Sequence, residues 1–302
     1  MTSAHGIRRW ALLAFGAALA GTTARATTDL ARGLDCYQAG RYAEARRLLR
    51  AAEISRPADP DLEFHLGRLA LWFDDAGEAL TRLERAVAAD PGDARLHNAL
   101  GDAYGLAATA APLWRKPGLA RRCLAAYERA ARLEPRQPAY RWSLLGFHAL
   151  APRLAGGDRD EARRQAAALA ELDEVEGRIA RATLALLAQR PDEAFAEFEP
   201  VLKRHQDDPR ALYQFGRCAD LARTRQREGI AALERCLELP LPPDADASTL
   251  ALIHHRLGNL WAQVGEPARL QPGEAATPPL SPALRSAART PASKYGPAAA
   301  PG

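Results

Sequence analysis

Small residues recur along this chain with a period of 34 residues. The two copies in strict register each keep one glycine, two alanines and one proline: Gly33, Ala45, Ala52 and Pro57, then Gly67, Ala79, Ala86 and Pro91. A period of this length predicts helical hairpins that stack into a solenoid. The proline that closes each copy marks a helix end, because its ring and missing N–H cannot continue a helix. Since no strand-like alternation competes with this pattern, the sequence predicts an all-α fold.

Further copies follow with less regular spacing. The third and fourth carry insertions between their two predicted helices, near residues 107–117 and 150–157. The fifth copy matches weakly, the sixth is one residue longer than the ideal, and the seventh stops matching after its first helix. The residues that open these copies are Leu100, Gly101 and Tyr104; Trp142, Leu145, Gly146 and Ala149; Ala182 and Ala185; Phe215, Gly216 and Ala219; and Leu257, Gly258 and Trp261.

This pattern resembles the tetratricopeptide repeat (TPR) family, whose repeat runs W-x2-L-G-x2-Y, then A-x3-F, then A and P. Trp142, Leu145 and Gly146 are the best match to its opening. The resemblance covers about residues 27–266 and implies a right-handed superhelical solenoid of about six to seven helical hairpins. It also implies that the glycine at the eighth position of a repeat leaves room for the facing backbone. An alanine-rich helical bundle with different packing is the alternative.

The two ends of the sequence differ from the repeats. Arg8 and Arg9 precede a short apolar run, and Ala24-Arg25-Ala26 fits a cleavage site, so residues 1–26 resemble a secretory signal peptide. We expect an exported protein, by resemblance one of a Gram-negative periplasm; an uncleaved N-terminal anchor is the alternative. Residues 267–302 contain 8 prolines, 10 alanines and few large apolar side chains, which predicts a disordered tail.

Charge and motifs argue against several classes of function. The formal net charge is +4, and cleavage after residue 26 would remove three arginines and no acid, leaving 4 − 3 = +1. There is no basic stripe with interleaved aromatics, so a nucleic-acid partner is not favoured. The sequence contains no G-x-S-x-G, P-loop, H-E-x-x-H or G-x-G-x-x-G motif. We therefore predict no catalysis, no cofactor, no metal and no stable membrane insertion.

Four cysteines, Cys36, Cys123, Cys218 and Cys236, occupy repeat positions that are normally buried. One interpretation treats all four as core thiols that act as small apolar groups. The other joins Cys218 to Cys236, on the two predicted helices of one hairpin, by a disulfide whose geometry the sequence does not determine.

The TPR resemblance implies that the first helix of each hairpin lines a concave face. The positions that point into this face combine aromatic side chains with arginine and asparagine, which suits a peptide partner. The predicted contacts are Phe64, Arg68, Trp72, Asn98, Asp102, Phe147, Tyr213 and Arg217. Alternatively, the three residues Phe64, Phe147 and Tyr213 pack against the next repeat. The Lys/Asn/Lys/Arg set with which some TPR proteins clamp a terminal carboxylate is absent.

The insertions form a second candidate surface, because insertions in repeat proteins usually map to loops on one face. Trp114 and Arg115 in the first insertion could be an exposed anchor; in the alternative, Trp114 plugs the end of its hairpin. The function predicted from these features is a non-catalytic protein-binding scaffold or adaptor of the cell envelope. A periplasmic chaperone for exported chains, a thiol enzyme using Cys123, and self-association through the incomplete last repeat are the alternatives.

Overall fold

The structure is a computed structural model that describes residues 28–54, 56, 59–240 and 247–266. These residues form α-helices and contain no β-strand, as the repeat predicted. The predicted signal peptide at 1–26 and the predicted tail at 267–302 lie outside the described residues. No helix within the described part of the chain has the length and apolar character needed to cross a bilayer.

The helices follow one another as antiparallel hairpins. The first helix occupies residues 28–38. After it come α2 (Tyr42–Glu53), α3 (Pro60–Trp72), α4 (Ala76–Ala89), α5 (Ala94–Ala110), α6 (Lys116–Leu133), α7 (Pro138–Leu150), the short 3-10 helix η1 (Arg153–Ala155), α8 (Arg159–Leu172), α9 (Glu174–Leu187), α10 (Pro191–Arg204), α11 (Pro209–Ala222), α12 (Gln226–Glu238) and α13 (Ala247–Gln263).

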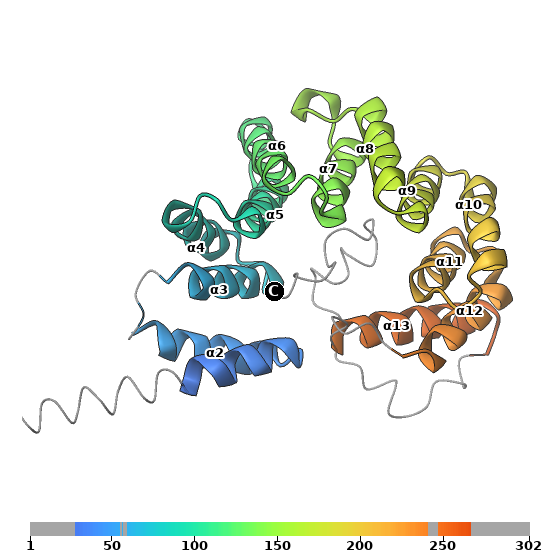
Figure 1. The fold of residues 1–302 in the computed structure, drawn as a ribbon, viewed down its shortest axis with the longest axis horizontal. Helices are drawn as coiled ribbons and strands as arrows, with labels where there is room; N and C mark the ends of the chain where they lie inside the picture. The colour runs from blue at the N-terminus through green and yellow to red at the C-terminus, as the bar shows by residue number, and fades with distance from the viewer. Residues whose placement is uncertain (1–27, 55, 57–58, 241–246, 267–302) are drawn as a thin grey trace, which may run out of the picture.

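These helices build a curved stack. Figure 1 shows an arc in which the first helices of the hairpins, from α3 to α13, lie on the inner side, while α4, α6, α8, α10 and α12 lie on the outer side. Successive first helices touch: α3 contacts α5, α7 contacts α9, and α11 contacts both α9 and α13. The inner side is therefore made by helices from different repeats, which contact one another within two groups, α3 with α5 and α7 through α13.

Local sequence signals set the helix boundaries. Asp59 and Asp208 cap α3 and α11, their carboxylates accepting hydrogen bonds from backbone N–H groups of the first turn. A proline follows each of these caps, at the position where its missing N–H removes no helical bond. Pro91 and Pro135 lie just beyond the ends of α4 and α6, as the repeat predicted.

The repeated glycine makes room for a side chain rather than for the facing backbone. A Cβ atom added to Gly67 would lie 2.6 Å from Leu83 Cγ, and one added to Gly101 would lie 2.4 Å from Tyr127 Cε1. In both hairpins the large residue comes from the second helix and sits directly on the glycine. The family resemblance led us to expect that the glycine makes room for the facing backbone, and this expectation is corrected. Each of the two glycines instead leaves space for one large side chain of the second helix.

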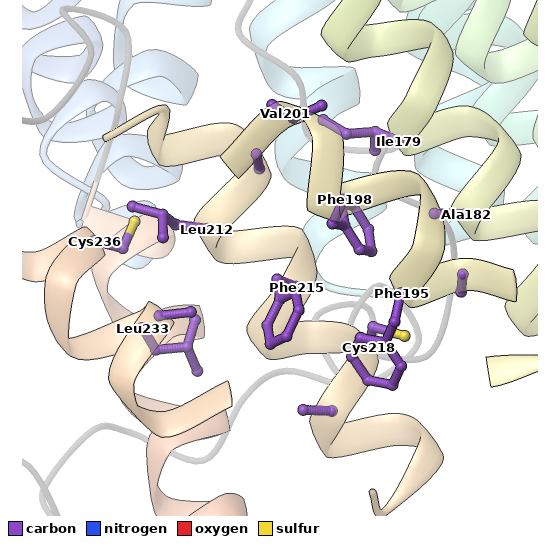
Figure 2. Packing of buried hydrophobic residues seen from close by; sticks show 14 of the residues in the cluster. Ile179, Ala182, Phe195, Phe198, Val201, Leu212, Phe215, Cys218, Leu233 and Cys236 are labelled. Atoms are coloured by element: carbon purple, nitrogen blue, oxygen red, sulfur yellow. The ribbon is translucent and has the colours of Figure 1, made fainter. Parts of the chain in front are cut away.

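The hydrophobic core runs along the stack between inner and outer helices. Its largest cluster extends from α7 to α13 and includes Phe195, Phe198 and Phe215 (Figure 2). The rings of Phe195 and Phe215 have centroids 5.0 Å apart, and Phe198 lies edge-on to Phe215 at 6.1 Å. The fifth hairpin, α9 and α10, matches the repeat poorly in sequence, but its apolar side chains are buried in the same cluster as those of α11 and α12.

The two insertions take different forms. The first mostly lengthens helices: α5 runs to Ala110 and α6 starts at Lys116, so only residues 111–115 connect them. The second is a compact loop after α7. The N–H of Gly157 donates to Pro152 O at 3.1 Å, and the N–H of Asp158 donates to His148 O at 3.1 Å. Gly156 adopts φ +100°, which favours glycine because other residues are strained there.

Candidate functional site

Polar groups in the interior are concentrated on the inner helices. Only Gln165 on α8 is an exception among the described residues. The other buried polar or charged side chains lie on the first helices of hairpins: Glu63, Asp102, Ser143, His148, Thr183, Gln214, Arg217, Asp220 and Arg256. Because buried polar groups cost free energy unless they are bonded, these side chains need hydrogen-bond partners.

At the N-terminal end of the inner side, the predicted residues divide into core and surface. Phe64 on α3 is buried and packs in one cluster with Leu96 and Leu100 of α5. Arg68 is half-buried, with its guanidinium carbon 6.0 Å from the centre of the Phe64 ring. Trp72, also half-buried, contacts the ring of Tyr42 at 4.2 Å. Phe64 therefore joins two repeats, while Arg68 and Trp72 remain partly accessible.

Two buried polar atoms in this region have no hydrogen-bond partner among the described residues. They are Nδ1 of His65 on α3 and Oδ1 of Asn98 on α5. The His65 ring lies 5.0 Å from that of Tyr37 in the preceding repeat. Burial lowers the pKa of His65 to about 4, and the positive charge of Arg68 acts in the same direction. His65 is therefore neutral at physiological pH.

Asp102 is held inside its own hairpin. It is 9% exposed, and its Oδ1 accepts a hydrogen bond of 2.7 Å from the hydroxyl of Tyr127 on α6. Burial, and then the charge of Asp102, raise the pKa of Tyr127 well above its ordinary value. The pair joins the two helices of the third repeat.

A buried polar cluster joins α11 to α13 at the C-terminal end. Asp220 accepts hydrogen bonds from Arg256 Nη1 at 3.0 Å, Asn259 Nδ2 at 3.3 Å and Gln263 Nε2 at 3.1 Å. Nε of Arg256 also donates to the Tyr213 hydroxyl at 3.2 Å. The predicted residue Tyr213 is therefore half-buried in a network that fixes the last helix.

Arg217 lies in the same region and is 5% exposed. Its Nη1 donates to Gln214 Oε1 at 3.3 Å. Burial lowers the pKa of Arg217 to about 10, and the nearby charge of Arg256 acts in the same direction. Even so, the guanidinium keeps its charge at neutral pH.

The residues predicted in and near the insertions differ in exposure. Trp114 is 81% exposed and Arg115 is exposed, so Trp114 does not plug its hairpin. Phe147 on α7 is half-buried and packs against the core cluster that contains Tyr127 and Leu144.

A polar cleft that the sequence did not reveal lies between α6 and α8, with α7 at its base. It has a volume of about 690 Å³. Nη1 of Arg141 donates to Gln165 Oε1 at 3.3 Å across it, while Nε of Arg141 and Nδ1 of His148 are buried without a partner among the described residues. The first insertion shifts the register of α6, so no periodic pattern relates these residues. Its lining consists of Glu128, Ala131, Arg132, Pro135, Arg141, Leu144, His148, Gly156, Asp158, Glu161 and Gln165.

All four cysteines are buried with free thiols. Figure 2 places Cys218 beside Phe195 and Cys236 beside Leu212, in different parts of the cluster. Burial raises the pKa of Cys218 to about 11 and also raises that of Cys236, so both thiols are protonated at neutral pH. Within the described residues, no group of three or more His, Cys, Asp and Glu side chains is placed to hold a metal ion.

Comparison with known proteins identifies the repeat. Residues 37–103, from the first helix into α5, match the tetratricopeptide repeat family. This part of the chain is similar to TPR repeats. The chain is also similar to a thermophilic TPR protein from Thermus thermophilus, with 27% identity and a TM-score of 0.54 over 65% of this chain and 98% of that chain. The predicted all-α superhelical TPR fold is confirmed.

A second solved structure has the same fold. It is a tetratricopeptide repeat protein from Parabacteroides merdae, with 14% identity and a TM-score of 0.50 over 88% of this chain and 98% of that chain. No curated protein matches the sequence. TPR proteins generally serve as non-catalytic scaffolds for protein interactions, and their repeats bind proteins or peptides.

Proposed function

We propose that this TPR protein is an exported scaffold of the cell envelope that holds an extended segment of one partner protein against its inner side. The N-terminal 26 residues would direct the chain to the periplasm, where the mature solenoid acts without catalysis or a cofactor. The partner would lie across first helices of successive repeats, such as α3 and α5, which contact each other.

The observation that carries this proposal is the group of half-buried aromatic and basic side chains around His65 on the inner side of α3. An extended peptide presents backbone N–H and C=O groups that need partners when they leave water. His65 Nδ1 and Asn98 Oδ1 lie among these side chains and lack partners, but both atoms are buried, so a peptide N–H would reach them only when a neighbouring side chain moves aside. The half-buried rings of Tyr37 and Trp72 offer apolar contact beside them, and Arg68 adds a positive charge.

Site-specific photo-crosslinking in the native host tests the proposal. A photoreactive residue at Arg68 or Trp72 should give one dominant protein adduct, identified by mass spectrometry. The matched control is Arg129, an exposed arginine on the outer helix α6, which should give no adduct with the same partner. Fractionation of the same cells should place a chain shortened by 26 residues in the periplasm.

The outcomes separate the proposal from its alternatives. A broad set of unrelated exported proteins captured at position 68 would indicate a chaperone instead of a scaffold. Equal capture of one partner at position 129 would contradict the inner-side assignment. A full-length chain in the cytoplasm would remove the envelope from the proposal, while leaving the crosslinked partner to be interpreted by itself.

A further inference from the structure

The two insertions carry the most exposed apolar side chains of the hairpin ends. Leu154 is 92% exposed, and Leu113 and Trp114 are each 81% exposed. In the described part of the chain, Ile54 is the only other large apolar side chain with comparable exposure. A tryptophan this open to water buries almost none of its apolar area in the folded chain, so packing does not account for its position.

The tips of the two insertions, Leu113 and Trp114 in the first and Leu154 in the second, lie at the same edge of the stack. They follow the C-terminal ends of α5 and α7, which are first helices of successive hairpins. The turn η1 contacts α6, and a Cβ on Gly156 would lie 3.6 Å from Leu124 Cδ2 of that helix. Leu124 is about 12 Å along α6 from the turn that carries Trp114, at about 1.5 Å per residue. We call Leu113, Trp114, Arg115, Lys116, Arg153 and Leu154 the loop rim.

The loop rim is basic as well as apolar. Arg115 and Arg153 are exposed beside the apolar tips, with Lys116 next in the chain. No acidic residue occurs at 103–127 or 149–157. The first acids after the second tip are engaged on α8: Asp158 caps this helix, Asp160 pairs with Arg163, and Glu161 pairs with Arg164.

From this combination we infer that the loop rim docks on the surface of an anionic lipid bilayer. Tryptophan and leucine favour the interface between headgroups and acyl chains, and arginine and lysine favour the anionic headgroups above it. Apolar anchors of protein interfaces are usually set in a packed patch. Here each tip projects separately and has basic neighbours, which suits a soft, laterally uniform surface. The solenoid would thus be held at a membrane that it does not span.

Trp114 provides a direct readout, because among the tryptophans of the described residues Trp142 and Trp261 are buried and Trp72 is half-buried. The fifth tryptophan, Trp10, lies outside the described residues, and its emission is common to the wild type and W114F. The full chain is mixed with vesicles of phosphatidylcholine and phosphatidylglycerol in equal parts, some containing brominated acyl chains. The difference in emission between the wild type and W114F isolates Trp114. We expect this difference signal to shift to the blue and to be quenched by bromine, whereas vesicles of phosphatidylcholine alone should have no effect.

Vesicle flotation of three variants tests the residues. L113S/W114S/L154S should lose the rim-dependent binding, and R115Q/K116Q should weaken the partition coefficient about thirtyfold, since two basic groups near an anionic surface are lost. The matched control is I54S, because Ile54 is 86% exposed in the connection between α2 and α3, away from the loop rim. All variants keep the apolar residues at 10–20, so only differences between them report the loop rim.

Three results would overturn the inference. One is a Trp114 signal that is not quenched when the chain floats with anionic vesicles, because another segment would then hold it. Another is equal loss of binding in I54S and in the triple variant. The last is no flotation at all together with a protein adduct from a photoreactive residue at 114, which would assign the loop rim to an acidic protein partner.

Discussion

His65 couples the inner surface to pH at the scale of a single residue. Its pKa falls from 6.5 to about 4 on folding, mainly through burial and then through the charge of Arg68. Between pH 6.5 and about pH 4, His65 is therefore mostly protonated in the unfolded chain but mostly neutral in the folded chain. The stability that depends on neutral His65 is complete above pH 6.5 and is lost as the pH falls toward 4, with a total of about 3 kcal/mol.

His65→Phe tests this coupling, because the ring contacts with Tyr37 and Phe64 are kept while the titrating group is removed. Denaturant unfolding of both proteins should be compared at pH 7 and pH 4.5. The wild type should lose more stability on acidification than the variant, and carboxylates that titrate in both proteins cancel in the comparison. An identical loss in the two proteins would show that His65 is not the responsible group.

The sequence located candidate residues better than it determined their exposure. The repeat correctly placed Phe64, Asp102 and Arg217 on first helices, but it does not distinguish a side chain that packs on the next repeat from one that faces a partner. Phe64 and Arg217 are 3% and 5% exposed, while Trp114 is 81% exposed. The periodicity of the repeat gives the direction in which a side chain leaves its helix. The exposure of that side chain depends on how closely the neighbouring helix approaches in that direction.

At the scale of an element, α13 depends on one buried carboxylate. Asp220 is 7% exposed and bonds to Arg256, Asn259 and Gln263, all on α13. Asp220→Ala would leave the Arg256 guanidinium, 1% exposed, without this carboxylate. Removing one partner of a buried ion pair typically costs about 3–5 kcal/mol. Amide hydrogen exchange in α13 should accelerate, while exchange in α3 and α4 stays unchanged.

Glu128→Ala is the control for that variant, since the Glu128 carboxylate pairs with Arg132 at 3.5 Å on the surface. An exposed pair of this kind contributes at most about 1 kcal/mol. If both variants change α13 equally, the network does not hold this helix. The double variant Asp220→Leu, Arg256→Met should recover much of the loss, because apolar replacement of a whole buried pair is often neutral.

Helices and their order were predictable because helix ends carry strong local signals, such as Asp208 followed by Pro209. The structure of the two insertions was less predictable from the sequence. Residues 107–110 and 116–117, read as inserted segment, became parts of α5 and α6, since neither Lys116 nor Pro117 interrupts a helix at its start. The cleft between α6 and α8 is lined by the C-terminal half of α6, by α7 and by residues between 156 and 165. It arises from the spacing of whole elements, which the repeat pattern does not encode.

At the scale of the molecule, each repeat contacts mainly its neighbours, so cooperativity depends on every interface being strong. Gly101 on α5 is a position where a substitution should weaken such an interface. A Cβ there would lie 2.4 Å from Tyr127 Cε1, and that ring is held by its hydrogen bond to Asp102. Gly101→Ala should therefore destabilise the third hairpin by about 1–3 kcal/mol through overpacking.

Gly105, one turn further along α5, is the matched control for Gly101. A Cβ on Gly105 would lie 3.7 Å from Cys123 Sγ, an ordinary contact. Gly105→Ala should stabilise the helix by about 0.5–1 kcal/mol, because alanine loses less backbone entropy than glycine. In urea, the wild type and Gly105→Ala should unfold in one transition. Gly101→Ala should show two, since the hairpins before α5 and those after α6 lose their cooperative link. One shared transition for all three proteins would mean that coupling extends beyond nearest neighbours.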